Sequence, residues 1–267
     1  MKLATWNING ARARLPNLLA WLRAAKPDVA LLQEIKCEDD KFPRLEVEEL
    51  GYNIETHGQK GFNGVAILSK SRLEDVERGL PGDPTDMQAR YIEATVGTLR
   101  VASLYLPNGN PAPSDKFDYK LGWMDRLHVR AHALLAAEEA FVLGGDYNIC
   151  PNDRDVYDPQ AWENDALCRP ESRQRFRKTL YLGLTDAFRA LHPDETAYTY
   201  WDYQAGAWRK NQGLRIDHLL LSPLAADRLN ACEIDRDVRG HEEAGAKASD
   251  HVPIWCELAE KGRALPI

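Results

Sequence analysis

Short runs of apolar and β-branched residues recur along the chain, and these runs predict strands. They lie at residues 3–6, 29–32, 65–68, 90–96, 99–106, 141–143, 215–221 and 252–258. Several are almost continuously apolar, which is typical of strands buried on both faces, whereas the run at 90–96 alternates between apolar and polar positions. The chain is therefore expected to contain a substantial β-sheet core.

Apolar residues at helical spacing appear between these runs. The i, i+3, i+4, i+7 pattern predicts helices at residues 15–22 and 121–135, and a third helix, strongly basic on its polar side, is predicted at 172–182. Strands outnumber helices, and several strands follow one another with no helix between them. This order favours a mixed, largely antiparallel α/β sandwich over a doubly wound parallel sheet.

Length and composition indicate one ordinary globular unit. The chain has 267 residues, of which 44% are hydrophobic and 28% are charged, and such a chain buries a large core without disulfides. No repeat or long linker divides it, and the turn-rich segment at 107–118 is interpreted as a functional loop. We therefore expect a single domain spanning residues 1–267. No apolar run approaches the ~20 residues of a membrane span, and the N-terminus lacks a secretory signal, so we expect no membrane association.

The cysteines indicate the redox environment of the protein, and the net charge limits how it can bind a polyanion. The five cysteines are widely spaced and form no C-x-x-C pair, which predicts free thiols in a reducing cytoplasm. The formal net charge of −7 means that the field of the whole protein repels polyanions. A site for a phosphate-rich substrate therefore requires a local basic patch or a bound cation.

Polar side chains gather where the predicted strands begin or end. These residues are Asn7, Glu34, Tyr105, Asn108, Asp146, Asn148, Asp217, Asp250 and His251. Taken singly, each is most simply a turn residue or a helix cap. Strand ends brought together by a sheet are nevertheless where α/β folds build their sites, and this many polar ends favour one common site.

The residue types at these strand ends favour metal-assisted hydrolysis. Carboxylate and amide oxygens suit Mg²⁺ or Mn²⁺ and suit zinc poorly. Asp217 and His251 make a carboxylate–imidazole pair, in which the carboxylate raises the pKa of the imidazole and fixes its orientation. The sequence lacks the motifs of serine and cysteine nucleophiles, of P-loops and of dinucleotide binding. Attack of water on a phosphodiester is therefore the favoured chemistry.

Six segments of the chain resemble successive motifs of a known family. They are TWNINGARAR (5–14), PDVALLQEIK (27–36), YLPNGNP (105–111), GGDYNI (144–149), NQGLRIDHLLLS (211–222) and SDHVPIW (249–255). In this order they are similar to the exonuclease III family of apurinic/apyrimidinic endonucleases, within the wider DNase-I-like endonuclease/exonuclease/phosphatase superfamily. The resemblance implies an α/β (α+β) fold, a four-layered sandwich of two packed mixed β-sheets flanked by helices.

The resemblance also implies which residues surround a metal. Glu34, helped by Asn7, resembles the main ligand of Mg²⁺, with Mn²⁺ as the alternative, and Asp250 resembles a further carboxylate near that metal. The residues that resemble the border of a second metal position are Asp146, Asn148 and His251. Whether turnover uses one metal or two is left open by the sequence.

Catalytic roles follow from the same resemblance. Asp146 resembles the carboxylate that takes a proton from the attacking water, and Asn148 resembles the amide that orients this water. His251, supported by Asp217, resembles the group that binds the scissile phosphate. Further phosphate contacts are implied for Tyr105 and Asn108. Either Asp146 or His251 can serve as the base, and we favour Asp146 because pairing with Asp217 should keep His251 protonated.

Contacts to the duplex require basic residues near the strand ends. The candidates are Arg12, Lys60 and Arg90, which would bind backbone phosphates of the duplex without recognising its base sequence. The basic helix around residues 173–178 is another candidate, against the simpler interpretation of a solvated helix face.

Three residues near the motif at 211–222 complete the expected site. By position, Tyr200, Leu214 and Ile216 resemble the apolar pocket that receives an extruded abasic deoxyribose. The simpler interpretation is ordinary core packing.

We therefore expect a Mg²⁺-dependent DNA repair nuclease of exonuclease III type. It would hydrolyse the phosphodiester 5′ to abasic sites and process the 3′ ends of double-stranded DNA as a 3′–5′ exonuclease and 3′-phosphodiesterase, acting as a monomer. The alternatives are a phosphoesterase of the same superfamily with a non-DNA substrate, and a catalytically silent DNA-binding relative. The balance between abasic-site incision and 3′ trimming is not fixed by the sequence.

Overall fold

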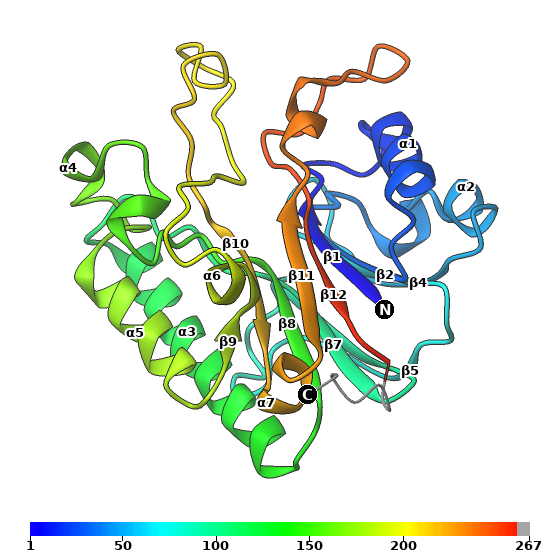
Figure 1. Ribbon diagram of the computed structural model, residues 1–267, viewed down its shortest axis with the longest axis horizontal. Coiled ribbons are helices and arrows are strands. Elements are labelled where there is room, and N and C mark those ends of the chain that lie inside the picture. The colour runs from blue at the N-terminus through cyan, green and yellow to red at the C-terminus, as the bar shows by residue number, and fades with distance from the viewer. Residues whose placement is uncertain (261–267) are drawn as a thin grey trace.

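Two six-stranded sheets form the centre of the computed structural model, which describes residues 1–260 (Figure 1). The first sheet, in the order β11-β12-β1-β2-β4-β3, contains β1 (Lys2–Asn7), β2 (Val29–Gln33), β3 (Asn53–His57), β4 (Val65–Ser69), β11 (Leu229–Ile234) and β12 (Ile254–Leu258). The second, in the order β5-β6-β7-β8-β10-β9, contains β5 (Glu74–Arg78), β6 (Tyr91–Val96), β7 (Leu99–Tyr105), β8 (Phe141–Asp146), β9 (Thr185–Asp186) and β10 (Asp217–Leu221). The pairings β1–β2 and β7–β8 are parallel, and the other pairings of the described strands are antiparallel.

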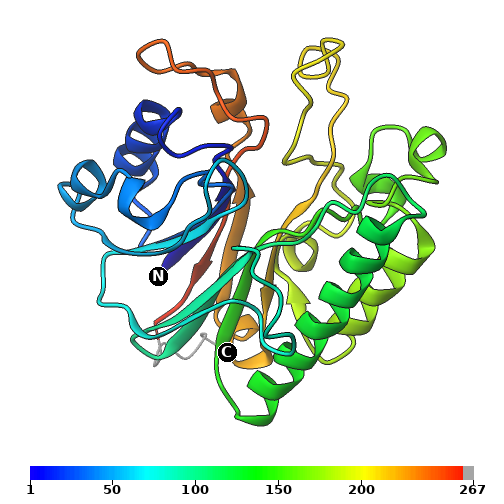
Figure 2. The same ribbon diagram turned by 180° about the vertical axis from the view of Figure 1, so that it is seen from behind.

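Helices cover the outer faces of the two sheets. The helices α1 (Leu15–Ala25) and α2 (Arg44–Glu48) pack on the first sheet, and α3 (Asp115–Ala136) and α5 (Pro170–Leu180) pack on the second, as the two opposite views show (Figures 1 and 2). Shorter helical segments lie in the connections: α4 (Pro159–Trp162), α6 (Ala187–Leu191), α7 (Pro223–Ala226), η1 (Asp39–Lys41), η2 (Asp153–Asp155) and η3 (Arg236–Gly240). The helix–sheet–sheet–helix order confirms the predicted four-layered sandwich of mixed sheets.

The interface between the sheets is the principal apolar core. Leu3 and Leu31 of the first sheet belong to one fully buried cluster with Val142 and Leu219 of the second. Each such side chain contributes roughly 1.5–3 kcal/mol on burial. Gly144 on β8 permits the close approach of the sheets, because a Cβ there would lie 2.6 Å from Leu31 Cδ1.

All eight predicted strands are present, but four further strands were not predicted. The missed strands are β3, β5, β9 and β11. The sequence of β5 is EDVER and almost entirely exposed, and β9 has two residues, so neither carries an apolar run that a sequence pattern could reveal. The interpretation of 107–118 as loop was partly wrong, because α3 already begins at Asp115. Its start is capped by the Ser114 hydroxyl, which accepts a hydrogen bond from the Phe117 amide at 3.4 Å.

The cysteines are core residues in this fold. All five are buried and free. Cys232 and Cys256 occupy facing positions on β11 and β12, where they fill space between neighbouring apolar side chains. Within residues 1–260, no helix has both the length and the apolar character that crossing a bilayer demands.

The sheet topology brings the polar strand ends to one rim of the sandwich. Because β1 and β2 are parallel, Asn7 and Gln33 are partners at their carboxyl ends, and for the same reason Tyr105 lies beside Asp146 on β7 and β8. The strand β10 is antiparallel to β8 and begins at Asp217, directly opposite Asp146. The strand β12 is antiparallel to β1, so the residues just before β12 lie beyond the end of β1.

Replacing Gly145 by alanine should destabilise the fold. A Cβ at this position would lie 1.9 Å from the carbonyl oxygen of Leu104 on the neighbouring strand, so the backbone must shift. We expect Gly145→Ala to lower the free energy of unfolding by about 2–4 kcal/mol in urea titrations. Gly122→Ala is the matched control, because Gly122 lies on α3 with no atom within 4 Å of the added Cβ, and there alanine should stabilise the helix by about 0.5–1 kcal/mol. Equal effects of the two substitutions would contradict this account.

Candidate active site

A cavity of about 250 Å³ opens at the rim where the strand ends meet. Ten of the residues predicted for the site line it: Glu34, Tyr105, Asn108, Asp146, Asn148, Tyr200, Leu214, Ile216, Asp250 and His251. Asn7 and Asp217 are fully buried and contact lining residues through hydrogen bonds. Residues from seven separate segments of the sequence are therefore gathered around one small volume.

Asn7 links two of the carboxylates that line the cavity. Its Nδ2 donates to Glu34 Oε1 at 2.9 Å and to Asp146 Oδ2 at 3.0 Å. Glu34 follows β2 with a left-handed φ of 50°, and its Oε2 lies 2.7 Å from the Lys36 ammonium. Burial opposes the charge of Glu34, but Lys36 and Asn7 outweigh it and lower the pKa of the carboxyl. Glu34 is therefore a fixed carboxylate at the floor of the cavity.

His251 lies between two carboxylates. Its Nδ1 donates to Asp217 Oδ2 at 2.9 Å, and its Nε2 lies 3.7 Å from Asp146 Oδ2. Burial alone would lower the pKa of His251, but the charges of Asp217 and Asp146 raise it to about 10. The side chain is therefore an imidazolium whose Nε2 proton is available to an anion in the cavity.

The backbone after β8 turns sharply to aim an amide into the cavity. Asn148 has a φ of 48°, its main-chain N–H donates to Asp146 Oδ1 at 2.9 Å, and its Nδ2 donates to the Leu106 carbonyl at 2.9 Å. Asn108 Nδ2 donates to Asn148 Oδ1 at 3.1 Å. These bonds fix the orientation of both amides relative to Asp146.

A buried lysine that the sequence analysis missed supports these two loops. Lys120 Nζ donates to the main-chain carbonyls of Asn148 at 2.6 Å and Asn108 at 3.0 Å. Burial lowers the pKa of Lys120 to about 7, although nearby Asp165 and Asp146 favour its charge. Its position inside the apolar periodicity of α3 was the available signal, since a lysine on the buried face of a helix needs polar partners.

Tyr105 is held beside the carboxylates by Arg90. The guanidinium lies 4.8 Å from the centre of the Tyr105 ring, and its Nη1 donates to the Tyr105 carbonyl at 3.2 Å. Burial, with the charges of Glu34 and Asp146, raises the pKa of the phenol. Tyr105 is thus kept as a neutral hydrogen-bond donor, and Arg90 orients this tyrosine from outside the lining of the cavity.

The donor set fits a hard divalent cation. Carboxylates of Glu34, Asp146 and Asp250 line the same cavity, and burial raises the pKa of Asp146, which shows that the protein's own cations do not fully offset the buried negative charge there. The Asp217 Oδ1 atom is also buried with no hydrogen-bond partner among the described residues. Ligand atoms of Asp146, Asp217 and His251 lie within 4.8 Å of one another, but an imidazolium has no lone pair to offer a metal, so the oxygen ligands are the better set.

Part of the cavity lining is apolar: Leu214, Ile216 and the ring of Tyr200 belong to it. Leu214 forms isolated bridges with Tyr200 and Val156, and the Tyr200 ring centre lies 4.9 Å from that of His251. Four lining residues were missed by the sequence analysis: Asn110, Trp162, Asp165 and Leu167. They lie in loops and on the four-residue helix α4, where no periodicity marks them.

Three basic candidates differ in their placement. Arg12 and Lys60 are exposed and do not line the cavity, whereas Arg90 acts on it through Tyr105. Their contacts with a duplex stay predictions.

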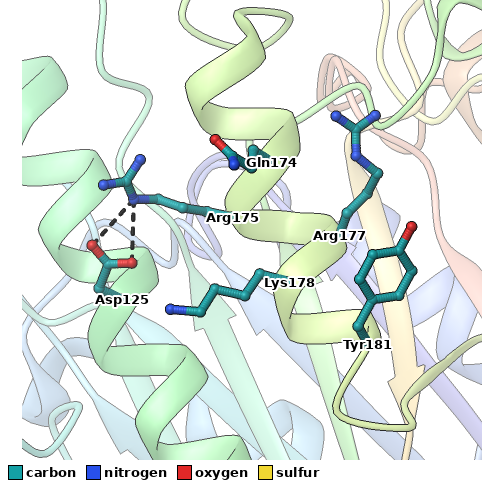
Figure 3. A pocket seen from close by; sticks show the side chains of 6 residues that line it. All are labelled: Asp125, Gln174, Arg175, Arg177, Lys178 and Tyr181. Atoms are coloured by element: carbon teal, nitrogen blue, oxygen red, sulfur yellow. Dashed lines mark hydrogen bonds and ion pairs between the residues drawn. The ribbon is translucent and has the colours of Figure 1, made fainter.

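Much of the basic character of α5 is used within the protein. Arg173 and Arg175 pair with Asp153 at 2.7 Å and Asp125 at 3.1 Å. The remaining cations of this helix line a separate surface cavity of about 430 Å³ between α3 and α5, with residues Asp125, Gln174, Arg175, Arg177, Lys178 and Tyr181 (Figure 3). This cavity shares no lining residue with the candidate site. A contact of α5 with a duplex therefore stays a prediction, beside the interpretation of a solvated helix face.

A buried ionic network underlies the start of β10. Arg215 donates from Nε to Asp155 at 2.7 Å and from Nη1 to Asp186 at 2.9 Å and to His218 Nδ1 at 3.0 Å. His218 Nε2 in turn donates to the Ile149 carbonyl at 3.0 Å. The network fastens the segment after Asn148 to β10 and so holds two parts of the site together.

Comparison with known proteins gives consistent matches over nearly the whole chain. Residues 4–251 match the model of the endonuclease/exonuclease/phosphatase family. The exodeoxyribonuclease III of Haemophilus influenzae is 37% identical over 270 aligned residues, covering 97% of this chain and 100% of that protein. The solved structure of an AP endonuclease from Archaeoglobus fulgidus has a TM-score of 0.92 and 36% identity, covering 97% of this chain and 99% of that one. The 3′ phosphatase NExo from Neisseria, bound to a product DNA hairpin, has a TM-score of 0.94 and 40% identity, covering 97% and 100%.

Acid should destabilise the fold through His218. Burial and the Arg215 charge lower the pKa of His218 to about 4 in the folded state, against about 6.5 in an unfolded chain. The folded pKa is depressed, so the stabilising contribution of neutral His218 is complete above about pH 6.5 and is lost as the pH falls towards 4. The loss is on the order of 3 kcal/mol.

Urea unfolding of the wild type and of His218→Gln at about pH 7 and about pH 4.5 measures this effect. The wild type should lose more stability than the variant between these two conditions, because glutamine does not titrate. The same loss in both proteins would show that His218 does not carry the acid sensitivity.

Proposed function

The chain belongs to the endonuclease/exonuclease/phosphatase family and is a hydrolytic nuclease, and on that premise we propose that it is a Mg²⁺-dependent DNA repair enzyme of exonuclease III type. It hydrolyses the phosphodiester 5′ to abasic sites and processes the 3′ ends of double-stranded DNA. One domain, residues 1–267, carries this activity, acting as a monomer in the cytoplasm, where five free thiols stay reduced.

The observation that carries the proposal is the composition of the 250 Å³ cavity. Its lining combines carboxylates, amides and an imidazolium with apolar groups of Tyr200, Leu214 and Ile216. A phosphodiester with an attached deoxyribose has matching parts, an anion and a sugar whose C–H groups are apolar. The cavity thus supports a nuclease over a DNA-binding relative without catalytic groups.

A metal ion held by the oxygens of Glu34, Asp146 and Asp250 would supply positive charge for the phosphate oxygens and the departing 3′-oxygen. His251 donates its Nε2 proton to a phosphate oxygen, and Asp217 keeps the ring oriented for this contact. The neutral phenol of Tyr105 adds a second donor.

Asp146 takes the proton of the attacking water in this proposal. Both nitrogens of His251 face carboxylates, at 2.9 Å and 3.7 Å, so both carry protons and neither can accept one. The main-chain N–H of Asn148 donates to the Asp146 carboxylate. The side-chain amide of Asn148, held by the Leu106 carbonyl and by Asn108, positions the water in this proposal. Proton acceptance and phosphate binding are thus proposed for separate groups, Asp146 and His251.

The apolar part of the cavity lining supports abasic specificity. Tyr200, Leu214 and Ile216 offer a surface for a deoxyribose that has turned out of the helix. A nucleotide without its base costs less to extrude than an intact one. Arg12 and Lys60 are retained as proposed contacts to the flanking phosphates.

The decisive experiment uses a labelled duplex with a single tetrahydrofuran abasic site. We expect cleavage immediately 5′ to this site, with a 3′-hydroxyl product, in Mg²⁺ and no cleavage in EDTA. Binding without cleavage in Mg²⁺ would contradict catalysis, and the absence of both binding and cleavage would point to a non-DNA substrate.

Substitution of the proposed base separates the roles of the two central residues. Asp146→Asn should lower kcat by at least ~10³-fold with the duplex still bound, because the proton acceptor is lost. Asp227→Asn is the control, since Asp227 is exposed and does not line the cavity. Near-normal turnover by Asp146→Asn, measured on the same abasic duplex, would assign the base elsewhere.

A further inference from the structure

Several lining residues have no part in the proposed chemistry, among them Trp162 and Asp165. Trp162 and Asp165 lie in the wall formed by α4 and the turn after it. The helix is fixed by Asp158, whose Oδ1 accepts from the Ala161 amide at 3.1 Å, and the Tyr157 ring packs edge-on against Trp162 at 6.3 Å. These contacts fix the local conformation of the segment that places Trp162 in the lining of the cavity.

Asp165 is connected to the catalytic side by a chain of amides. Asn108 donates to Asn148 at 3.1 Å, Asn110 Nδ2 donates to Asn108 Oδ1 at 2.9 Å, and the same Nδ2 lies 3.1 Å from both oxygens of Asp165. The Leu167 amide also donates to Asp165 Oδ1 at 2.9 Å. The Asp165 carboxylate thus has a fixed position, linked to Asn148 through the side chains of Asn108 and Asn110.

The charge of this wall is negative. Among the described residues 1–260, those that line the cavity include no arginine and no lysine, and the ammonium of Lys120 is buried and bonded to the main-chain carbonyls of Asn108 and Asn148. A hydroxyl group that reaches Asp165 finds a hydrogen-bond acceptor. A phosphate that reaches the same point finds a like charge and no paired cation.

We propose that Trp162 and Asp165 select the fragment on the 3′ side of the cleaved bond, favouring a terminal nucleotide with a free 3′-hydroxyl over an abasic residue inside a continuous strand. This inference rests on the proposed nuclease function and concerns the balance between 3′ trimming and internal incision. Trp162 recognises the base by stacking. Asp165 accepts from the 3′-hydroxyl and disfavours a following phosphate.

Three duplex substrates separate the two contributions. The first ends in a normal 3′ nucleotide, the second ends in a 3′-terminal tetrahydrofuran, and the third carries the tetrahydrofuran within the strand. The first and second differ only in the base, which tests Trp162. The second and third differ in the following phosphate, which tests Asp165.

Trp162→Ala should lower the ratio of kcat/KM for the terminal nucleotide to that for the terminal tetrahydrofuran by roughly 10-fold, the size of one stacking contact. Trp162→Phe should restore most of this ratio, since phenylalanine also stacks. A ratio for Trp162→Ala within ~2-fold of the wild type, in a protein that unfolds at the wild-type temperature, would overturn the role of Trp162.

Asp165→Asn keeps an oxygen for the Leu167 amide and removes the charge. We expect it to lower the ratio of kcat/KM for the terminal to that for the internal tetrahydrofuran by about 10-fold, mainly through faster internal incision. Glu163→Gln is the matched control, because Glu163 is exposed on the same segment and does not line the cavity.

Parallel changes in Asp165→Asn and Glu163→Gln, or an unchanged ratio in Asp165→Asn, would overturn the role of Asp165. A wild-type protein that cleaves none of the three substrates in Mg²⁺ would overturn the proposed nuclease function itself. The two failures are therefore distinguishable in one set of assays.

Discussion

The crowding of buried carboxylates at one rim of the sandwich is the constraint that organises this molecule. Glu34 and Asp146 share a single nitrogen of Asn7, and Asp217 stands opposite Asp146 in the sheet. Each buried carboxylate left alone costs several kcal/mol. The protein offsets this cost with amide donors, with the His251 imidazolium and with Lys36, which pairs with Glu34. A divalent cation would neutralise the negative charge that remains.

The same constraint explains which parts of the site could be predicted from sequence. Asp146 and His251 directly follow or precede apolar runs, and a polar residue at the end of a buried strand stands out against its neighbours. The local pattern therefore marks such residues as candidates, whereas their convergence depends on the sheet topology and their roles were implied by the family resemblance. Trp162 and Asp165 were not predicted because they follow no strand and belong to a segment whose position is set by tertiary contacts.

The fold was predictable to a similar extent. Strands with apolar runs were found, whereas the exposed β5 was not, because its residues are held by hydrogen bonds to β6 rather than by burial. Lys120 shows the converse case. Its helix was predicted, but its role depends on two carbonyls from distant loops, which no spacing within the helix can indicate.

Many of the basic residues are paired with acidic residues inside the protein. Arg173 and Arg175 are neutralised by neighbouring aspartates, and Arg215 is fully buried among acidic partners. Many cations of this acidic protein therefore hold the structure together and contribute little to an external field. Attraction of a phosphate then depends on the His251 imidazolium in the cavity and on exposed cations such as Arg12 and Lys60.

The pairing of Asp217 with Asp146 across β10 and β8 has a consequence for how such a chain can change over time. Side chains alternate between the faces of a strand, so inserting or deleting one residue in either strand would turn one of these aspartates to the opposite face. Insertions and deletions are therefore confined to the connecting loops. In β8 and β10 the residue types can change during divergence, but the number of residues in each strand cannot.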